Sequence, residues 1–149
     1  MLLSCQLVFW SNPLYSQSFS ALELSVHEQV NQYRASLGLN SLELNEDISK
    51  AARIHSQNMA QGIVAFSHDG FEQRVEVISS TIPYRRIAEN VAYNQGYDDP
   101  VTVAVEGWID SPGHQQNMTG DFNLTGVGVA KNDAGEYYFT QIFILTISR

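Results

Sequence analysis

The chain has 149 residues, of which 44% are hydrophobic, so it is long enough to build one domain around its own core. Its 16 acidic residues outnumber its 8 lysines and arginines, and the resulting net charge of −8 argues against a nucleic-acid partner, which needs a basic surface. A single cysteine, Cys5, excludes a disulfide within this chain and a zinc site built from cysteines.

Residues 1–24 form an N-terminal segment that we separate from a domain at 25–149. The apolar run at 1–10 is much shorter than the ~20 residues of a membrane-spanning helix, so no transmembrane segment is predicted. It also lacks the basic residues that open a secretory signal peptide. Two interpretations stay open, namely an incomplete signal peptide with a polar cleavage region at 15–21, and a frayed N-terminal segment without a targeting role.

Helices are predicted where a capping residue precedes apolar residues at helical spacing. Ser25 and Glu28 fit a capping box for the first helix, and Asn45 precedes the second. Asp99 and Pro100 suit the N-cap and the first helical position of the last helix, which stops before Pro112. The predicted helices are 26–37, 46–62, about 71–78, and 100–111.

Strands are predicted in the last third of the chain. Residues 124–131 and 136–147 are rich in β-branched and aromatic side chains and flank a turn at 132–135, which indicates a β-hairpin. The second of these strands is expected to be central because 139–147 is largely apolar. A third strand is expected at 88–93. Helices followed by strands favour an α+β layered fold over a doubly wound α/β fold.

Two histidines lie where a functional site is favoured. His68 and His114 are flanked by glycine or proline in predicted loops, which often carry function. His27 and His55 lie on amphipathic helices, where a surface or half-buried structural role is favoured. Glu89 follows two arginines, so it either pairs with arginine or shares a cleft with a histidine. A carboxylate beside an imidazole suits a divalent metal or a histidine held in one tautomer.

Six segments in order, covering essentially the whole of 25–147, resemble one protein family. They are the helix at 26–37, the second helix with its lead-in at 42–60, Phe66-Ser67-His68, 88–92 (Ala-Glu-Asn-Val-Ala), 106–118 with Ser-Pro-Gly-His, and the hairpin at 126–143. Together they resemble the CAP superfamily of cysteine-rich secretory, antigen 5 and pathogenesis-related 1 proteins, in its short bacterial branch.

The resemblance implies an α+β fold, a three-layer α-β-α sandwich with a mainly antiparallel central sheet and a polar cleft. In eukaryotic relatives this cleft holds two His and two Glu and can bind a divalent cation such as zinc. His68 and Glu89 match the first His and Glu, whereas Ser111 and Tyr138 replace the other two. Two ligands rarely hold zinc alone, so His114 is a candidate third ligand. The alternative, that His114 only caps the preceding helix, stays open.

The resemblance further implies a secreted, periplasmic or envelope-associated monomer that binds a small molecule, with lipids or sterols as ligands in parts of the family. The expected ligand-binding cleft is His68, Glu89, His114 and Tyr138, and the candidate zinc ligands are the first three. We expect a non-enzymatic protein that requires no cofactor. A protease-like hydrolase using Ser111, His114 and Glu89 is the alternative, although no activating elbow or oxyanion hole is evident around Ser111.

Overall fold

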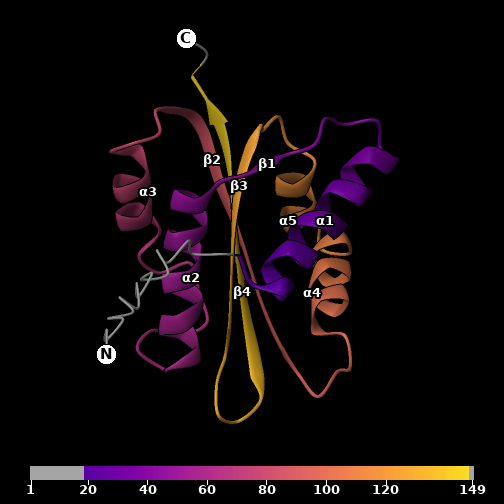
Figure 1. Cartoon of the computed structure of the whole chain (residues 1–149), viewed down its shortest axis with the longest axis vertical. Helices are drawn as coiled ribbons and strands as arrows, with labels where there is room; N and C mark the ends of the chain where they lie inside the picture. The colour runs from indigo at the N-terminus through magenta and orange to yellow at the C-terminus, as the bar shows by residue number, and fades with distance from the viewer. Residues whose placement is uncertain (1–18, 148–149) are drawn as a thin grey trace, which may run out of the picture.

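A four-stranded sheet separates two groups of helices in the computed structural model, which describes residues 19–147 (Figure 1). Two helices cover one face of the sheet and three cover the other, which confirms the predicted three-layer α+β sandwich. The first group is α2 (Glu46–Ala60) and α3 (Phe71–Ser79), and the second is α1 (Ala21–Ser36), α4 (Pro100–Ile109) and α5 (Pro112–Met118). Residues 1–18, which hold most of the predicted signal segment, lie outside the described range.

The sheet is mainly antiparallel, as predicted, with the strand order β1-β3-β4-β2. Strand β4 pairs with antiparallel neighbours on both sides, so its predicted central position is confirmed. The short β1 pairs with β3 in parallel, and β2 lies at the opposite edge. The strands are β1 (Glu43–Leu44), β2 (Tyr84–Gln95), β3 (Leu124–Lys131) and β4 (Glu136–Thr146). Strand β2 is thus longer than the predicted 88–93, and β1 was not predicted.

Helix α1 begins five residues earlier than predicted. Its capping box is Ser20 with Glu23 rather than Ser25 with Glu28, because the Ser20 Oγ accepts a hydrogen bond from Glu23 N at 3.2 Å and the Glu23 carboxylate accepts one from Ser20 N at 2.9 Å. The same carboxylate accepts two hydrogen bonds from the Arg53 guanidinium, at 2.8 and 2.9 Å. This ion pair, whose carboxylate is buried, ties the start of α1 to α2.

Helix α2 lies against β3 at backbone contact distance. A Cβ atom at Gly128 would lie 2.1 Å from Arg53 N, and one at Gly126 would lie 2.3 Å from Ser49 N, so only glycine fits at either position. The Ser56 Oγ donates a hydrogen bond to Gly128 O at 2.9 Å. These contacts fix the position of α2 and of the loop that follows it.

The core has two parts, one on each face of the sheet. Trp108, Phe139 and Phe143 fill the side under α1 and α4, and Ile142 and Ile144 pack with α2 and α3 on the other side. Within 19–147, no helix combines the length and the apolar character needed to cross a membrane.

Candidate functional site

The Glu89 carboxylate is the centre of the predicted site and is held by two partners. Strand β2 carries it beside α3, where the side chain is only 2% exposed. Arg74 of α3 donates from Nε to Oε2 at 2.8 Å and from Nη2 to Oε1 at 2.7 Å. His68 Nδ1 lies 3.0 Å from Oε1. Two-pronged guanidinium–carboxylate pairs are the strong, geometrically specific kind of ion pair. The structure therefore brings His68 and Glu89 together, and Arg74 links α3 to β2 through the same carboxylate.

Arg74 also closes the loop that carries His68. Its Nη1 donates to Asp69 O at 2.9 Å and its Nη2 lies 3.3 Å from His68 O. The sequence suggested an arginine partner for Glu89, but from the pair that precedes it in the same strand. The partner that the fold supplies is 15 residues away on a helix, and no local pattern in the sequence points to it.

His55 fixes the other side of this loop. It is 2% exposed, and its Nε2 lies 2.9 Å from Ser67 O, one residue before His68. Burial lowers the pKa of His55, more than the hydrogen bond to Ser67 O raises it, so the ring is neutral at pH 7. The sequence favoured a surface or half-buried structural role for His55. The structural role stands, but the side chain is fully buried and positions the loop that carries His68.

His114 lies inside a helix rather than in the loop that the sequence predicted. Residues 112–118 form α5, with Pro112 at a first-turn position that suits proline and Ser111 as the N-cap. The Ser111 Oγ and the His114 Nδ1 are 2.9 Å apart. Burial, together with the nearby charge of His68, lowers the pKa of His114, which is therefore neutral at pH 7.

Two asparagines hold α5 against the strand that carries Glu89. Asn90 Nδ2 donates to His114 O at 3.1 Å, and Asn117 Nδ2 donates to Asn90 Oδ1 at 2.9 Å and to Glu89 O at 3.3 Å. Asn90 is fully buried, so these bonds also satisfy polar groups that have no access to water. Neither asparagine was predicted from the sequence as a site residue. Both lie in segments that carried the family resemblance.

A hollow of about 290 Å³ opens beside His114, at the free edge of β2. Its lining includes the aromatic Phe66 and Tyr93 and the polar Ser111 and His114. Its remaining lining is mostly small or apolar and comes from β2 and α4, namely Val91, Ala92, Asn94, Val103, Ala104, Gly107 and Trp108. Tyr138, which the sequence placed in the cleft, does not line the hollow, but its ring stacks on that of Tyr93 with the ring centres 5.6 Å apart. This is the His114 hollow.

The residues predicted to bind zinc do not form a complete set of ligands. Among residues 19–147, no group of three or more His, Cys, Asp or Glu side chains is placed to hold a metal ion. The carboxylate that would bind the ion is already neutralised by Arg74, and Ser111 and Tyr138 offer hydroxyl groups where the family has Glu and His. These residues do not fit the three-or-four-ligand sphere that zinc prefers.

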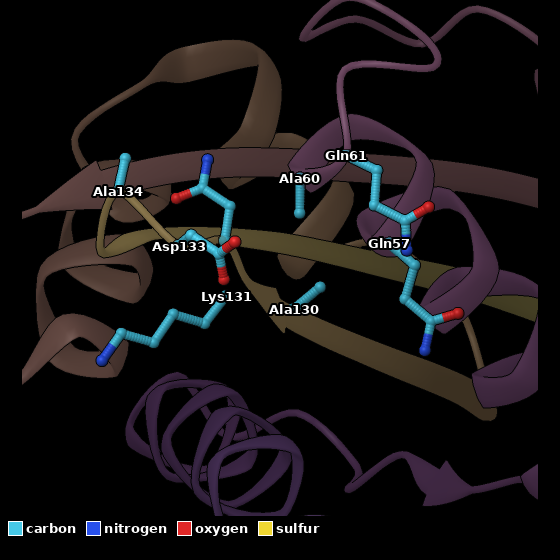
Figure 2. Close-up of a pocket in the computed structure, with 8 residues that line it drawn as sticks. Gln57, Ala60, Gln61, Ala130, Lys131, Asp133 and Ala134 are labelled. Atoms are coloured by element: carbon cyan, nitrogen blue, oxygen red, sulfur yellow. The ribbon is translucent and has the colours of Figure 1, made fainter.

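A second and roomier hollow, of about 550 Å³, lies between the end of α2 and the β3–β4 hairpin, where its lining residue Ala130 is the cross-strand partner of Tyr138 (Figure 2). Gln57 and Gln61 from the end of α2 line it together with Lys131 and Asp133 from the β3–β4 hairpin. None of the site residues predicted from the sequence lines this hollow.

Comparison with known proteins identifies the relatives of this chain. The model of the CAP family, described as the cysteine-rich secretory protein family, matches residues 27–143. The chain is 34% identical over 130 residues to the uncharacterized protein YkwD of Bacillus subtilis, a match that covers 85% of the chain and 48% of YkwD. The chain thus spans about half the length of this curated relative.

Solved structures share the fold. An extracellular protein with an SCP domain from Bacillus anthracis superposes with a TM-score of 0.71 at 24% identity, over 84% of this chain and 40% of that one. An outer surface protein of Borrelia burgdorferi also gives a TM-score of 0.71, at 17% identity, over 87% of this chain and 97% of its own. At these identities the likeness concerns the fold alone.

Proposed function

The chain belongs to the CAP family of cysteine-rich secretory proteins, and from this premise we propose that it is an extracellular, non-enzymatic module that binds a small neutral ligand in the His114 hollow. The extracellular setting is supported by the two structural relatives, one an extracellular protein and the other an outer surface protein.

One observation carries the proposal, namely that both oxygens of Glu89 are engaged by Arg74, with His68 on one of them. The carboxylate is therefore not free to bind a cation, and the histidine that it holds is His68 rather than His114. The positive charge of Arg74 is neutralised by the same contact. Next to this closed ion pair, the His114 hollow offers a neutral imidazole, a hydroxyl group and apolar walls. Convergent polar groups on a mostly apolar pocket are typical of small-molecule sites.

The test is a nuclear magnetic resonance screen of the ¹⁵N-labelled chain against a library of neutral small compounds. We expect ligands whose chemical-shift changes centre on the amides of Ser111 and His114, and whose binding is lost in His114→Ala. Gln61→Ala, in the hollow of Figure 2, is the matched control and keeps the binding. Compounds that bind only at Gln61, or none that bind at all, would overturn the proposal.

A hydrolase remains the second candidate because the Ser111 Oγ lies 2.9 Å from the His114 Nδ1, as a nucleophile and its base would. Two features weigh against it. Glu89, the expected third member, is engaged elsewhere, and the Ser111 N–H donates to Trp108 O, so it is not available to stabilise an oxyanion. A fluorophosphonate probe distinguishes the two functions, since labelling of the wild type but not of Ser111→Ala would favour the hydrolase.

A further inference from the structure

Three aromatic side chains form a continuous strip beside the His114 hollow. Phe66, from the loop after α2, and Tyr93 of β2 have ring centres 5.1 Å apart at an angle of 59°. Tyr93 and Tyr138 are cross-strand partners on β2 and β4, and their rings stack 5.6 Å apart. Phe66, Tyr93 and Tyr138 are the aromatic strip. Its first two members also line the His114 hollow.

Two of the three rings of the strip are exposed to solvent to an extent that packing alone does not explain, while Tyr138 is half-buried. Tyr93 is 52% exposed and Phe66 is 46% exposed, although both touch another aromatic ring. An exposed apolar cluster with a polar rim is the kind of surface that marks a binding site. Because each ring has an apolar face, a flat ligand with apolar carbon–hydrogen groups on one side can stack on it.

The polar groups at the strip suit hydroxyl ligands rather than charged ones. Ser111 and His114 form a hydroxyl–imidazole pair that offers both a donor and an acceptor, and both residues line the hollow. Asn94 lines it as well, and its buried Oδ1 accepts no hydrogen bond from the described residues. Among the described residues no lysine or arginine lines the hollow, the guanidinium of Arg74 is bound to Glu89, and the chain as a whole is acidic. A polyanion therefore finds no complementary charge here.

The free edge of β2 does not favour an added peptide strand. Trp108 Nε1 donates to Val91 O at 3.0 Å, and Asn117 Nδ2 donates to Glu89 O at 3.3 Å. These side chains occupy main-chain acceptors that a peptide would need for strand addition. The side-chain surface of the hollow and the strip remains the place where a ligand would be recognised.

We propose that the aromatic strip and the His114 hollow together bind a neutral saccharide, whose ring faces stack on Phe66 and Tyr93 while its hydroxyl groups hydrogen-bond to Ser111 and His114. A saccharide has apolar ring faces and a rim of neutral hydroxyl groups, which matches this division of the site. The hollow holds the end of the ligand, and the strip extends beyond it for further rings. The inference rests on the proposed ligand-binding function and names its ligand class.

The experiment is a titration of the ¹⁵N-labelled full chain with cellotetraose and, separately, with chitotetraose, both neutral tetrasaccharides. We expect saturable shift changes at the amides of Phe66, Tyr93 and His114. Tyr93→Ala should weaken binding about tenfold or more, since it removes a stacking ring. The matched control is Tyr97→Ala, which removes an equally exposed tyrosine (56%) outside the hollow and should change affinity less than about twofold.

The outcomes separate this inference from the proposed function. Equal loss in the two tyrosine variants, or no response to either tetrasaccharide, overturns the saccharide inference. If neutral library compounds still bind at His114, the proposed function survives that failure, and if they do not, both fail. A response to a proline-rich peptide at the same amides, without one to sugars, likewise overturns the inference. Tyr93→Thr, which keeps the strand preference for a β-branched residue, serves if the alanine variant unfolds.

Discussion

Arg74→Met tests the claim that Arg74 is the counter-ion on which Glu89 depends. The Glu89 side chain is 2% exposed and that of Arg74 is 11% exposed, so the pair is almost out of contact with water. Removing one partner of a buried ion pair costs about 3–5 kcal/mol, because the remaining charge is left without compensation. We expect the lower end of this range, since His68 stays within 3.0 Å of the carboxylate. The methionine keeps much of the side-chain volume.

The assay is urea unfolding at pH 7 of the wild type, Arg74→Met, and the double variant with Glu89→Gln. The double variant should lose clearly less stability than the sum of the two single variants, because it leaves no buried charge behind. Arg85→Met replaces an exposed arginine of β2 and should stay within about 0.5 kcal/mol of the wild type. If Arg74→Met costs less than about 1 kcal/mol, or if the two single losses add in full, the counter-ion reasoning is wrong.

Three further predictions follow from the site and its support. Isothermal titration of the wild type with zinc should give negligible heat, because Arg74 occupies the Glu89 carboxylate; saturable binding at the His68–Glu89 pair would contradict this. Gly128→Ala should lower the free energy of unfolding by at least about 1–3 kcal/mol in urea unfolding, since its Cβ would lie 2.1 Å from the backbone of α2. The control is Gly107→Ala, which should cost little stability because open space surrounds its Cβ position. Gly62→Ala is unsuitable as a control because Gly62 has a positive φ of 70°. The pKa of His55 in the folded chain lies below its unfolded value of 6.5, so the unfolded chain takes up the proton first as the pH falls. The stability that neutral His55 contributes is therefore complete above pH 6.5 and is lost as the pH falls through the lowered pKa. The stability advantage of the wild type over His55→Gln should therefore shrink between pH 7.5 and pH 5, and a gap that does not change with pH would refute it.

The helices and the hairpin could be predicted because their signals are local. Asn45 and Asp99 cap α2 and α4 as expected, through hydrogen bonds to the backbone three residues later. The hairpin of β3 and β4 follows from two strand-forming runs around a turn that contains a glycine. In each case a few neighbouring residues determine the conformation.

The features that the sequence did not predict depend on distant contacts. The two residues of β1 form a strand only because they pair with β3, about 80 positions later. The sequence read Pro112 and Gly113 as the end of a helix, whereas a proline in the first turn equally begins one, and α5 forms where Asn90 and Asn117 bind it to β2. Where a local pattern fits both interpretations, packing against distant residues decides between them, and the segment alone does not reveal that packing.

The site itself was half predictable for the same reason. His68 and Glu89 came from the resemblance and are in contact, but the groups that hold them, Arg74 and His55, were not assigned to the site. Both act across elements, one from α3 to β2 and the other from α2 to the following loop. The sequence can predict that a buried charged group needs a partner, but only the fold shows which residue that partner is.

The resemblance matches only half of the ligand set of eukaryotic relatives, and these contacts give that half a physical explanation. A carboxylate that merely survived the loss of a metal site would be left buried without a counter-charge, at a cost of several kcal/mol. Glu89 instead joins α3, the His68 loop and β2 through Arg74 and His68, which gives it a structural reason to remain. The two substituted positions also have new contacts, since Ser111 pairs with His114 and Tyr138 stacks on Tyr93. Under our proposals, the retained pair is therefore a support, and the substituted positions belong to the surface that binds the ligand.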